Sequence, residues 1–269
     1  MNETKIHPTA IIDPAAELDS SVSVGPYVVI EKKVKIGPDT LIKPHSVITG
    51  PTTIGNANTI GPFATIGAPP QDLKYQGEDT ELVVGDNNQI REYVSIHRGT
   101  VTDKGITTVG SDNLLMGYVH IAHDCQIGDL AILANGATLA GHVQIHDHAI
   151  IGGLVAVHQF TRIGAYSYIG GLSGVSKDVP PFVIVSGIRK DMRVSGINKI
   201  GLRRHGFDND TIKKLDKAYK IIFLSPDLLL KDALEQVISE ITGCEPVDQL
   251  IEFFKTSKQG VIRSIENID

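Results

Sequence analysis

The chain has 269 residues, of which 41% are hydrophobic and 21% charged, the ordinary composition of a globular protein. Its net charge of −6 argues against general nucleic-acid binding, and no apolar stretch reaches the roughly 18 residues of a membrane span. Because the N-terminus lacks a basic segment followed by an apolar run, we expect a cytoplasmic protein.

An aliphatic residue recurs at every sixth position through most of the first 175 residues. These hexad residues form three series, from Ile12 to Ile66, from Val84 to Ile96 and from Val109 to Val175. In many repeats a small or β-branched residue follows four positions later, as at Val28 and Ala131. Because side chains alternate along a strand, both residues point to the same side, which we expect to be the core.

The repeat predicts a mainly β fold, a parallel β-helix over residues 1–187. Each hexad supplies one short strand and one turn, and three hexads close a triangular coil of 18 residues. Successive coils then stack as parallel strands about 4.8 Å apart. Glycine directly follows several hexad residues, including Ile36, Ile60 and Ile163, so we expect it to provide the backbone freedom that the corners need.

Two segments interrupt the hexads and are predicted to be loops, at residues 67–83 and 99–108. Ile66 and Val84 are still 18 residues apart, so the first loop takes up the chain length of one whole coil. Solenoid proteins place such insertions on a functional face.

Residues 188–269 are predicted to form a C-terminal helical domain. Asn209 and Asp210 are predicted to cap one helical segment, residues 225–227 to open a second and Pro246 to begin a third. This domain would also cover the last coil and keep its strand edges from pairing with other chains.

Three histidines fall at nearly the same phase of the 18-residue coil: His123, His142 and His158. They should line one column on three successive coils, roughly 5 Å apart and outside the core. Scattered solvent-exposed histidines would need a coincidence of phase, so we favour a functional site. Cys125 lies four positions after Ile121, and we expect it to pack in the core rather than to act as a nucleophile.

A histidine beside a carboxylate suits general-base catalysis, and Asp124 directly follows His123. Zinc is the competing chemistry, because the hexapeptide solenoids of the gamma-class carbonic anhydrases carry three-histidine metal centres. Their ligand pattern includes two histidines five residues apart on one coil, and this sequence has no such pair. We therefore predict no metal and no cofactor.

Several segments closely resemble the UDP-N-acetylglucosamine acyltransferase family. They are QDLKY at 71–75, SDNLLMGYVHIAHDC at 111–125, LAGH at 139–142, AVHQF at 156–160 and GLRRHGF at 201–207. The resemblance covers essentially the whole chain. It implies a left-handed β-helix that transfers an (R)-3-hydroxyacyl chain from acyl carrier protein to the 3-hydroxyl of UDP-N-acetylglucosamine, the first step of lipid A synthesis.

The resemblance also assigns roles to single residues. It makes His123 the general base, Asp124 its orienting partner and the backbone N–H of Gly141 the donor that stabilises the oxyanion. Gly171 corresponds to the residue that limits acyl-chain length, and glycine there implies a donor near fourteen carbons. The residues that match substrate contacts are Gln71, Asp72, Lys74, His120, Asn135, His142, His158, Gln159, Asn198, Arg203 and Arg204.

Two further patterns agree with these partners. Residues 186–220 contain ten Lys and Arg against four Asp and Glu, a basic patch suited to an acidic protein such as acyl carrier protein. Gly117, Asn135, Gly153 and Gly171 share one phase, and such a column of small residues would leave a groove for a fatty chain. The resemblance implies a homotrimer with sites between neighbours.

Two other functions stay open at this point, and so does one detail of the acceptor. The first is an acetyltransferase of another hexapeptide family that uses acetyl-CoA, and the second is a non-catalytic trimeric scaffold. The acceptor sugar nucleotide could also carry a 3-amino group in place of the 3-hydroxyl.

Overall fold

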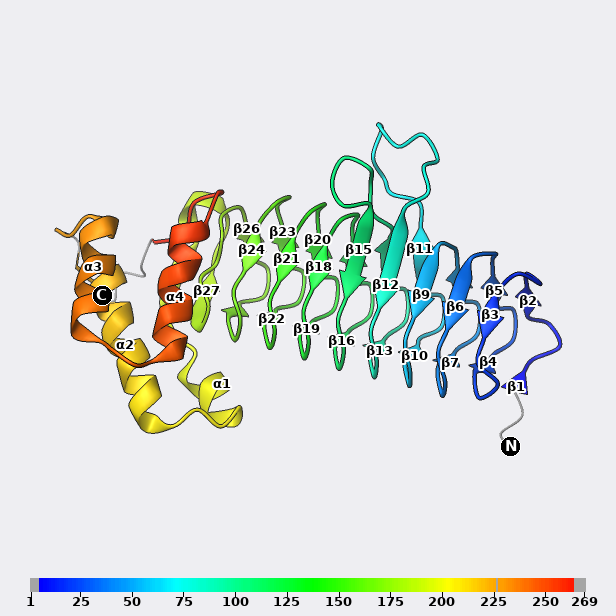
Figure 1. Cartoon of the computed structure of the whole chain (residues 1–269), viewed down its shortest axis with the longest axis horizontal. Helices are drawn as coiled ribbons and strands as arrows, with labels where there is room; N and C mark the ends of the chain where they lie inside the picture. The colour runs from blue at the N-terminus through cyan, green and yellow to red at the C-terminus, as the bar shows by residue number, and fades with distance from the viewer. Residues whose placement is uncertain (1–4, 226, 264–269) are drawn as a thin grey trace.

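The computed structural model describes residues 5–225 and 227–263, which form an elongated three-sided β-helix with helices at its C-terminal end (Figure 1). Each face of the described β-helix is one sheet, and neighbouring strands in a sheet belong to successive coils. His120 on one coil, for example, pairs in parallel with Thr138 on the next.

The three sheets are named A, B and C in the order in which the chain first meets them. Sheet A contains β1 (Lys5–Ile6), β4 (Ser23–Val24), β7 (Leu41–Ile42), β10 (Thr59–Ile60), β13 (Gln89–Ile90), β16 (Leu114–Leu115), β19 (Ile132–Leu133), β22 (Ile150–Ile151), β25 (Tyr168–Ile169), β27 (Val183–Ser186) and β28 (Arg193–Ile197). Sheet B contains β2 (Ile11–Ile12), β5 (Val29–Ile30), β8 (Val47–Ile48), β11 (Thr65–Ala68), β14 (Ser95–His97), β17 (His120–Ile121), β20 (Thr138–Leu139), β23 (Ala156–Val157) and β26 (Gly174–Val175). Sheet C contains β3 (Glu17–Leu18), β6 (Val34–Ile36), β9 (Thr52–Ile54), β12 (Glu81–Val84), β15 (Ile106–Val109), β18 (Gln126–Ile127), β21 (Gln144–Ile145) and β24 (Arg162–Ile163).

The hexad residues fill the interior, as predicted. From Val24 to Val175 each of them is at most 3% exposed. Burying one such aliphatic side chain stabilises the fold by about 1.5–3 kcal/mol relative to leaving it in water. Cys125 is also fully buried, and burial raises the pKa of its thiol to about 12, so it packs in the core as predicted.

The corners differ from the prediction about glycine. The left-handed backbone conformation falls three positions after the hexad residue, on residues such as Tyr27 and Tyr166, both with φ of 57°. The glycine that follows a hexad residue is needed for close packing. A Cβ at Gly61 would lie 2.4 Å from the backbone carbon of Arg91 on the next coil, a distance at which atoms overlap.

Two loops leave the β-helix at the same corner, between sheets B and C, and project from one edge (Figure 1). Residues 69–80 connect β11 to β12 and are called the long loop here. Residues 98–105 connect β14 to β15 and are called the short loop. Both segments begin and end inside or next to the predicted ranges 67–83 and 99–108, into which the flanking strands extend.

The C-terminal part begins with a hairpin rather than a helix. β27 runs parallel to β25 and antiparallel to β28, and a short 3-10 turn at Arg189–Asp191 lies between β27 and β28. The domain boundary proposed between residues 187 and 188 falls within this hairpin. The described helices that follow are α1 (Lys199–Arg204), α2 (Asn209–Phe223), α3 (Leu230–Glu240) and α4 (Glu245–Thr256).

Helix α1 was not predicted, because six residues that include Gly201 carry too weak a pattern. Helix α2 begins where expected, but its cap is Asp208, whose carboxylate accepts from the backbone N–H groups of Asp210 and Thr211. Helix α3 begins at Leu230, later than predicted, and Pro226 of the predicted start lies outside the described residues.

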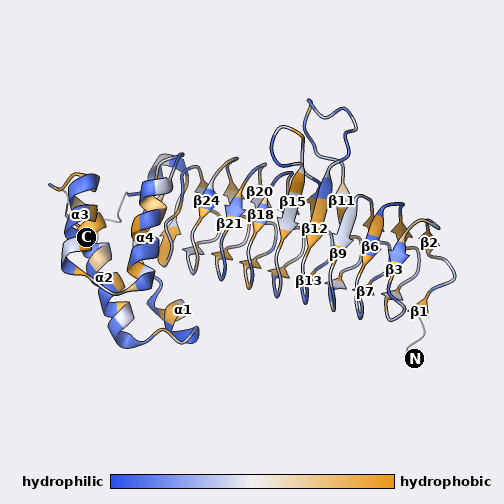
Figure 2. Ribbon diagram, in the orientation of Figure 1, coloured by the Kyte–Doolittle hydropathy of each residue, from blue (hydrophilic) through white to orange (hydrophobic). Residues whose placement is uncertain are grey.

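The helices turn an apolar face toward one another and cover the last coil. Each of α2, α3 and α4 carries both hydrophobic and hydrophilic side chains (Figure 2). The segment after α4 returns to the β-helix, where Val261 forms a parallel bridge with Asp178. The Ser257 hydroxyl donates to the carboxylate of Asp178 at 2.8 Å. These contacts close the C-terminal end of the β-helix.

Two polar residues are buried where the long loop begins. Arg98 is 6% exposed, and its guanidinium donates to the carbonyl of Gly67 at 2.6 Å and to the hydroxyl of Tyr75 at 3.1 Å. His97 beside it is 5% exposed and meets the ring of His120 edge-on, with 4.9 Å between centroids. Burial, together with the neighbouring His120, His123 and Arg98, lowers the pKa of His97 to about 4.

Replacing His97 with glutamine should make the protein less sensitive to acid. Between pH 6.5 and about 4 the unfolded state binds a proton at His97 that the folded state does not, so the free energy of unfolding falls as pH falls through this window. For the wild type the loss from this residue is on the order of 3 kcal/mol. Urea unfolding of both proteins at pH 7 and pH 4.5 measures the difference. Equal pH dependence in the two proteins would contradict the prediction.

Candidate active site

His123 and Asp124 lie at the corner between β17 and β18. His123 Nδ1 is 2.8 Å from Asp124 Oδ2, and the carboxylate is only 1% exposed. Burial raises the pKa of this carboxyl, but hydrogen bonds from His123 and Thr100 outweigh burial, so the pKa lies below its ordinary value. Asp124 is therefore charged at neutral pH and accepts a hydrogen bond from the Nδ1–H of His123, which leaves Nε2 of His123 as the proton acceptor.

Gly141 lies directly against the ring of His123. A Cβ built on Gly141 would come within 2.5 Å of His123 Cε1 and 2.8 Å of Nε2, so only glycine leaves room for the imidazole. Among the described residues no protein group accepts a hydrogen bond from the Gly141 N–H. A histidine that can accept a proton thus lies beside a backbone N–H that has no protein acceptor.

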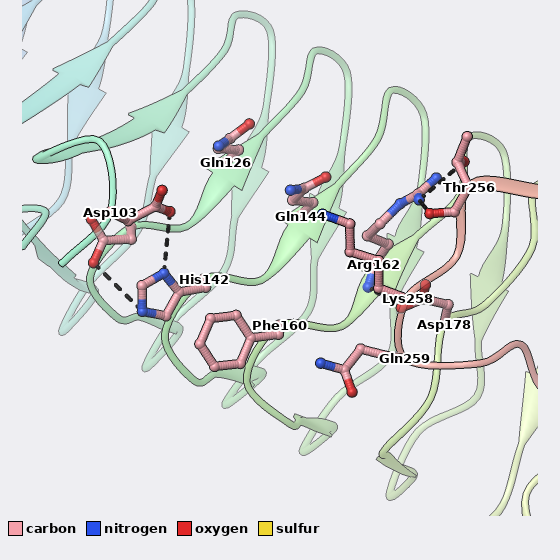
Figure 3. A pocket seen from close by; sticks show the side chains of 11 residues that line it. Asp103, Gln126, His142, Gln144, Phe160, Arg162, Asp178, Thr256, Lys258 and Gln259 are labelled. Atoms are coloured by element: carbon pink, nitrogen blue, oxygen red, sulfur yellow. Dashed lines mark hydrogen bonds and ion pairs between the residues drawn. The ribbon is translucent and has the colours of Figure 1, made fainter.

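His142 stands on the next coil, in the predicted column. Its ring meets that of His123 edge-on, with 5.1 Å between centroids, and stacks on Phe160 at 4.4 Å. Its Nδ1 lies 3.3 Å from Asp103 Oδ2 (Figure 3), and its Nε2 lies 3.8 Å from Asp124 Oδ2. His158, the third member of the column, is exposed, and its Nδ1 lies 3.1 Å from the carbonyl oxygen of Gln159.

The two loops and this corner enclose a cavity of about 860 Å³. The long loop, the short loop and the histidine corner all contribute lining residues. The lining residues are Gln71, Asp72, Leu73, Lys74, Thr102, Asp103, His123, His142, Gln159 and Phe160. Six of them were predicted from the sequence, whereas Leu73, Thr102, Asp103 and Phe160 were not.

A second, polar cavity of about 350 Å³ continues along sheet C from the same corner (Figure 3). It shares Asp103, His142 and Phe160 with the first cavity. Gln144 and Arg162 line its floor, and the segment after α4 closes its far end. Because Arg162 donates to the carbonyl and hydroxyl of Thr256, this end of the cavity is held shut by the C-terminal segment.

Other predicted residues lie away from this corner. His120 faces outward from β17, half-buried, with its Nδ1 2.8 Å from Ser95 Oγ. Asn135 and Gly171 lie at the corner between sheets A and B, where a Cβ on Gly171 would approach Gly153 O to 3.3 Å. The predicted column of small residues is therefore present. An apolar groove of about 430 Å³ runs beside it, lined in part by Leu154, Leu172, Val157, His158 and Ile188.

Asn198, Arg203 and Arg204 belong to a third place, the corner between sheets C and A. The Asn198 side chain caps α1 by accepting from the N–H of Gly201, and it donates to the carbonyl of Tyr166 at 2.9 Å. Arg203 and Arg204 are exposed and form no ion pair with the described residues. None of the three lines the cavity around His123. One chain alone therefore does not bring all the predicted residues together.

A metal ion is the remaining alternative for this corner. His123, Asp124 and His142 offer ligand atoms that all lie within 4.8 Å of one another. In this structure Asp124 Oδ2 accepts hydrogen bonds from His123 and from Thr100, and a metal bound to His123 Nδ1 would displace the first of them. The absence of a metal from the working site stays a prediction.

Comparison with known proteins shows that this chain is similar to one family of acyltransferases over nearly its whole length. Residues 178–262 match the family model described as UDP N-acetylglucosamine O-acyltransferase, domain 2, and residues 33–68 and 106–141 match the bacterial transferase hexapeptide repeat. The acyl-[acyl-carrier-protein]–UDP-N-acetylglucosamine O-acyltransferase of Burkholderia orbicola is 52% identical over 264 residues, which are 97% of this chain and 100% of that protein.

Solved structures agree. The UDP-N-acetylglucosamine O-acyltransferase of Moraxella catarrhalis is 47% identical and superposes with a TM-score of 0.91 over 96% of this chain and 99% of that one. The Francisella novicida UDP-N-acetylglucosamine acyltransferase is 38% identical, with a TM-score of 0.92 over 98% and 97%. The predicted fold class, a left-handed parallel β-helix with a C-terminal helical region, is confirmed.

Within the described residues, no helix is long and apolar enough to cross a membrane. The whole-length match to the Burkholderia orbicola enzyme, at an identity far above that of chance similarity, agrees with both family models and with the superposed structures. The chain is therefore an acyltransferase that belongs to the UDP-N-acetylglucosamine O-acyltransferase family.

Proposed function

We propose that this chain transfers an (R)-3-hydroxyacyl group from acyl carrier protein to the 3-hydroxyl of UDP-N-acetylglucosamine, the first step of lipid A synthesis. We propose that it does so in the cytoplasm and as a homotrimer. The observation that carries the reaction type is the corner where His123, oriented by the buried Asp124, lies against Gly141. The names of relatives that match over their whole length, as acyl-[acyl-carrier-protein]–UDP-N-acetylglucosamine O-acyltransferases, support the choice of substrates.

The proposed chemistry is general-base acyl transfer. His123 Nε2 takes the proton of the sugar hydroxyl as that oxygen attacks the thioester carbonyl. The carbonyl oxygen gains negative charge, and the N–H of Gly141 donates to it. When the tetrahedral intermediate collapses, the carbon–sulfur bond breaks and the proton on His123 passes to the departing thiolate. Asp124 stabilises the imidazolium during the time between these two proton transfers.

The other predicted residues have roles as substrate contacts in this proposal. Gln71, Asp72 and Lys74 of the long loop, with His142 and Gln159, line the cavity and would hold the sugar. Asn198, Arg203 and Arg204 lie at another corner, and guanidinium groups suit a diphosphate. In a trimer, the corner of a neighbouring chain that carries α1 could face this cavity. That arrangement would bring the arginines of one chain to the sugar-binding residues of the next.

The acyl chain would occupy the apolar groove beside Gly153 and Gly171. Leu154 and Leu172 flank it and are 65% and 70% exposed in the single chain. Exposing such apolar side chains to water is unfavourable, and a bound fatty chain or a neighbouring chain would cover them. The groove opens toward the 3-10 turn at Arg189–Asp191, which belongs to the basic patch.

The basic patch is weaker than its composition indicates. Asp216 pairs with both Lys199 and Lys220, at 2.6 and 3.0 Å, and Asp210 pairs with Lys214 at 2.9 Å. The exposed cations that form no ion pair with described residues include Arg189, which lines the groove proposed for the acyl chain. Its guanidinium is available to attract an acidic donor protein, mainly by speeding the encounter.

One assay separates the proposed function from its rivals. UDP-N-acetylglucosamine is offered with 3-hydroxyacyl groups on acyl carrier protein, or with acetyl-CoA. Transfer from acyl carrier protein supports the proposal, transfer from acetyl-CoA alone favours the acetyltransferase, and no transfer from either favours a scaffold.

Replacing His123 with alanine should lower acyl transfer by about 10²–10⁴-fold, the usual contribution of a general base. The fold should persist, because the side chain lies outside the aliphatic interior. Turnover with acyl carrier protein as donor and the thermal unfolding temperature are the measurements. A variant that keeps more than a few per cent of the wild-type turnover would remove His123 from its role.

Replacing Gly141 with alanine should reduce transfer nearly as much, although the backbone N–H is retained. The added methyl group would fall 2.5 Å from His123 Cε1 and push the imidazole away from its position. Gly25→Ala is the control, because the atoms nearest to a Cβ there belong to Pro44 and Ile42, at 3.0–3.2 Å, and Gly25 lines neither the cavity nor the groove. The kcat values of both variants are compared, and wild-type activity in Gly141→Ala would show that the reaction does not depend on the position that the imidazole holds against Gly141.

Replacing Gly171 with methionine should shift donor preference from long to short acyl chains. A Cβ at this position fits with a small adjustment, so the added side chain would extend into the groove rather than unfold the coil. A buried clash costs about 1–3 kcal/mol, or about 5- to 150-fold against the fourteen-carbon donor. Relative kcat/KM for ten- and fourteen-carbon donors is the measurement. A wild type that already prefers ten-carbon donors, or a variant with an unchanged chain-length preference, would contradict the role of Gly171.

A further inference from the structure

The short loop reaches the base of the site through Thr100, a residue that the sequence did not single out. Thr100 is 2% exposed. Its backbone N–H donates to Asp124 Oδ1 at 2.8 Å, and its hydroxyl donates to Asp124 Oδ2 at 2.6 Å. With His123 Nδ1 as the third donor, the buried carboxylate cannot turn without losing a hydrogen bond.

Neighbouring threonines extend this arrangement. Thr100 Oγ1 lies 2.7 Å from Thr102 Oγ1, and because the Thr100 proton points to Asp124, Thr102 is the donor of this contact. The backbone N–H of Asp124 donates to Thr107 Oγ1 at 2.8 Å. Thr107 lies in β15, the strand that follows the short loop. Both the backbone and the carboxylate of Asp124 are thus fastened by one continuous segment of chain.

The same loop also contacts the second histidine. Asp103 Oδ2 lies 3.3 Å from His142 Nδ1 (Figure 3), whereas the other ring nitrogen, Nε2, lies 3.8 Å from Asp124 Oδ2. The Asp103 side chain is 39% exposed, so solvent weakens this pair, whereas the Thr100 contacts are sheltered. His142 therefore lies between two carboxylates, the partly exposed Asp103 at 3.3 Å and the buried Asp124 at 3.8 Å.

Nothing in the regular coils could supply these groups. The corners between β17 and β18 and between β20 and β21 carry Asp124 and His142, and the chain there passes from one strand to the next without an insertion. Thr100 and Asp103 come from the extra residues that separate β14 from β15 on the preceding coil. The insertion itself therefore brings the partners that these two side chains lack elsewhere.

We infer that Thr100 and Asp103 are positioning residues: Thr100 fixes the carboxylate that orients His123, and Asp103 fixes the ring of His142. The inference rests on the proposed function, in which His123 is the base and His142 contacts the sugar. The two residues act on different parts of the reaction. Loss of the Thr100 hydroxyl lowers kcat, and loss of the Asp103 carboxylate raises KM for the sugar nucleotide.

The first test replaces Thr100 with valine, which keeps the shape and removes the hydroxyl. A lost hydrogen bond to a buried charged group should lower kcat by roughly 10- to 100-fold, with KM within about threefold of the wild type. Because the hydroxyl helps to hold the pKa of Asp124 down, the acidic limb of the kcat profile should move to higher pH. Thr100→Ser retains the hydroxyl and should recover most of the kcat.

The second test replaces Asp103 with alanine. The pair is partly exposed, so KM for UDP-N-acetylglucosamine should rise by only about two- to fivefold, and kcat should stay near the wild-type value. Val101→Ala is the control on the same loop, because Val101 is 58% exposed and lines neither cavity. Its kcat and KM should match those of the wild type.

A spectroscopic measurement keeps this test independent of turnover. The proton between His123 Nδ1 and Asp124 should give a low-field ¹H resonance that is present in the wild type and absent from His123→Ala. In Thr100→Val it should shift or broaden, and in Thr100→Ser it should be retained. If the wild type has no acyltransferase activity but the resonance responds in this way, the proposed function fails and the positioning role of Thr100 stands.

Three results would overturn the inference for Thr100. The first is a wild-type kcat together with an unchanged resonance in Thr100→Val. The second is a decrease of kcat in Thr100→Ser as large as that in Thr100→Val. The third is an increase of KM in Thr100→Val with no change of kcat. An effect of Asp103→Ala on kcat alone would overturn the role of Asp103. Thermal unfolding of each variant separates these results from misfolding, and if Thr100→Val does not fold, Thr100→Ala, which also removes the hydroxyl, replaces it in the kcat and resonance measurements.

Discussion

The stacking of coils around an aliphatic interior is the constraint on which the rest of this molecule depends. Each hexad residue must return to the core, so every sixth residue is fixed in space and each strand pairs with the one a full coil away. Ile121 lies beside Leu139, and Leu139 beside Val157. The corners between these strands inherit this regularity, because a turn of so few residues cannot move independently of the strands that flank it.

Such rigidity makes the close contact between His123 and Gly141 useful. The imidazole lies so near to Gly141 that no side chain fits there, and both residues are held by coils that cannot slide apart. A base and a backbone donor on flexible loops would have to be ordered when substrate binds, which costs conformational entropy. Here that ordering is provided by the fold before any substrate arrives.

The loops add what a regular solenoid cannot provide. They leave at a corner without interrupting sheet C, since β12 pairs with β9 on one side and β15 on the other. The long loop contributes one wall of the cavity, and Arg98 and Tyr75 tie its base to the coil below. The short loop contributes the donors that hold Asp124. A site with depth is thereby built on a surface that is otherwise flat.

A rod with three faces also separates functions in space. The histidine corner, the groove beside Gly171 and the arginines of α1 lie at three different corners. A second chain beside the first would bring two corners together, and this geometry is the physical basis for proposing an assembly of several chains.

The period of six determined the fold, the interior and the column of His123 and His142, because strand alternation and coil length act on neighbouring residues of the chain. Cys125 was placed in the core by the same argument. The resemblance of short motifs, rather than the period, led to Gly141 and to the long-loop residues. These predictions needed no knowledge of contacts between distant segments.

Only the tertiary structure decided where the left-handed corner residues lie. It also showed that the position after Ile60 must be glycine because the backbone of Arg91 lies so close, and that Thr100 and Asp103 contact the site. The same holds for the hairpin of β27 and β28, for α1, and for the buried His97 and Arg98. Each depends on how close one coil or loop comes to another. That distance is set by packing between segments far apart in the chain, and no local pattern of residue types encodes it.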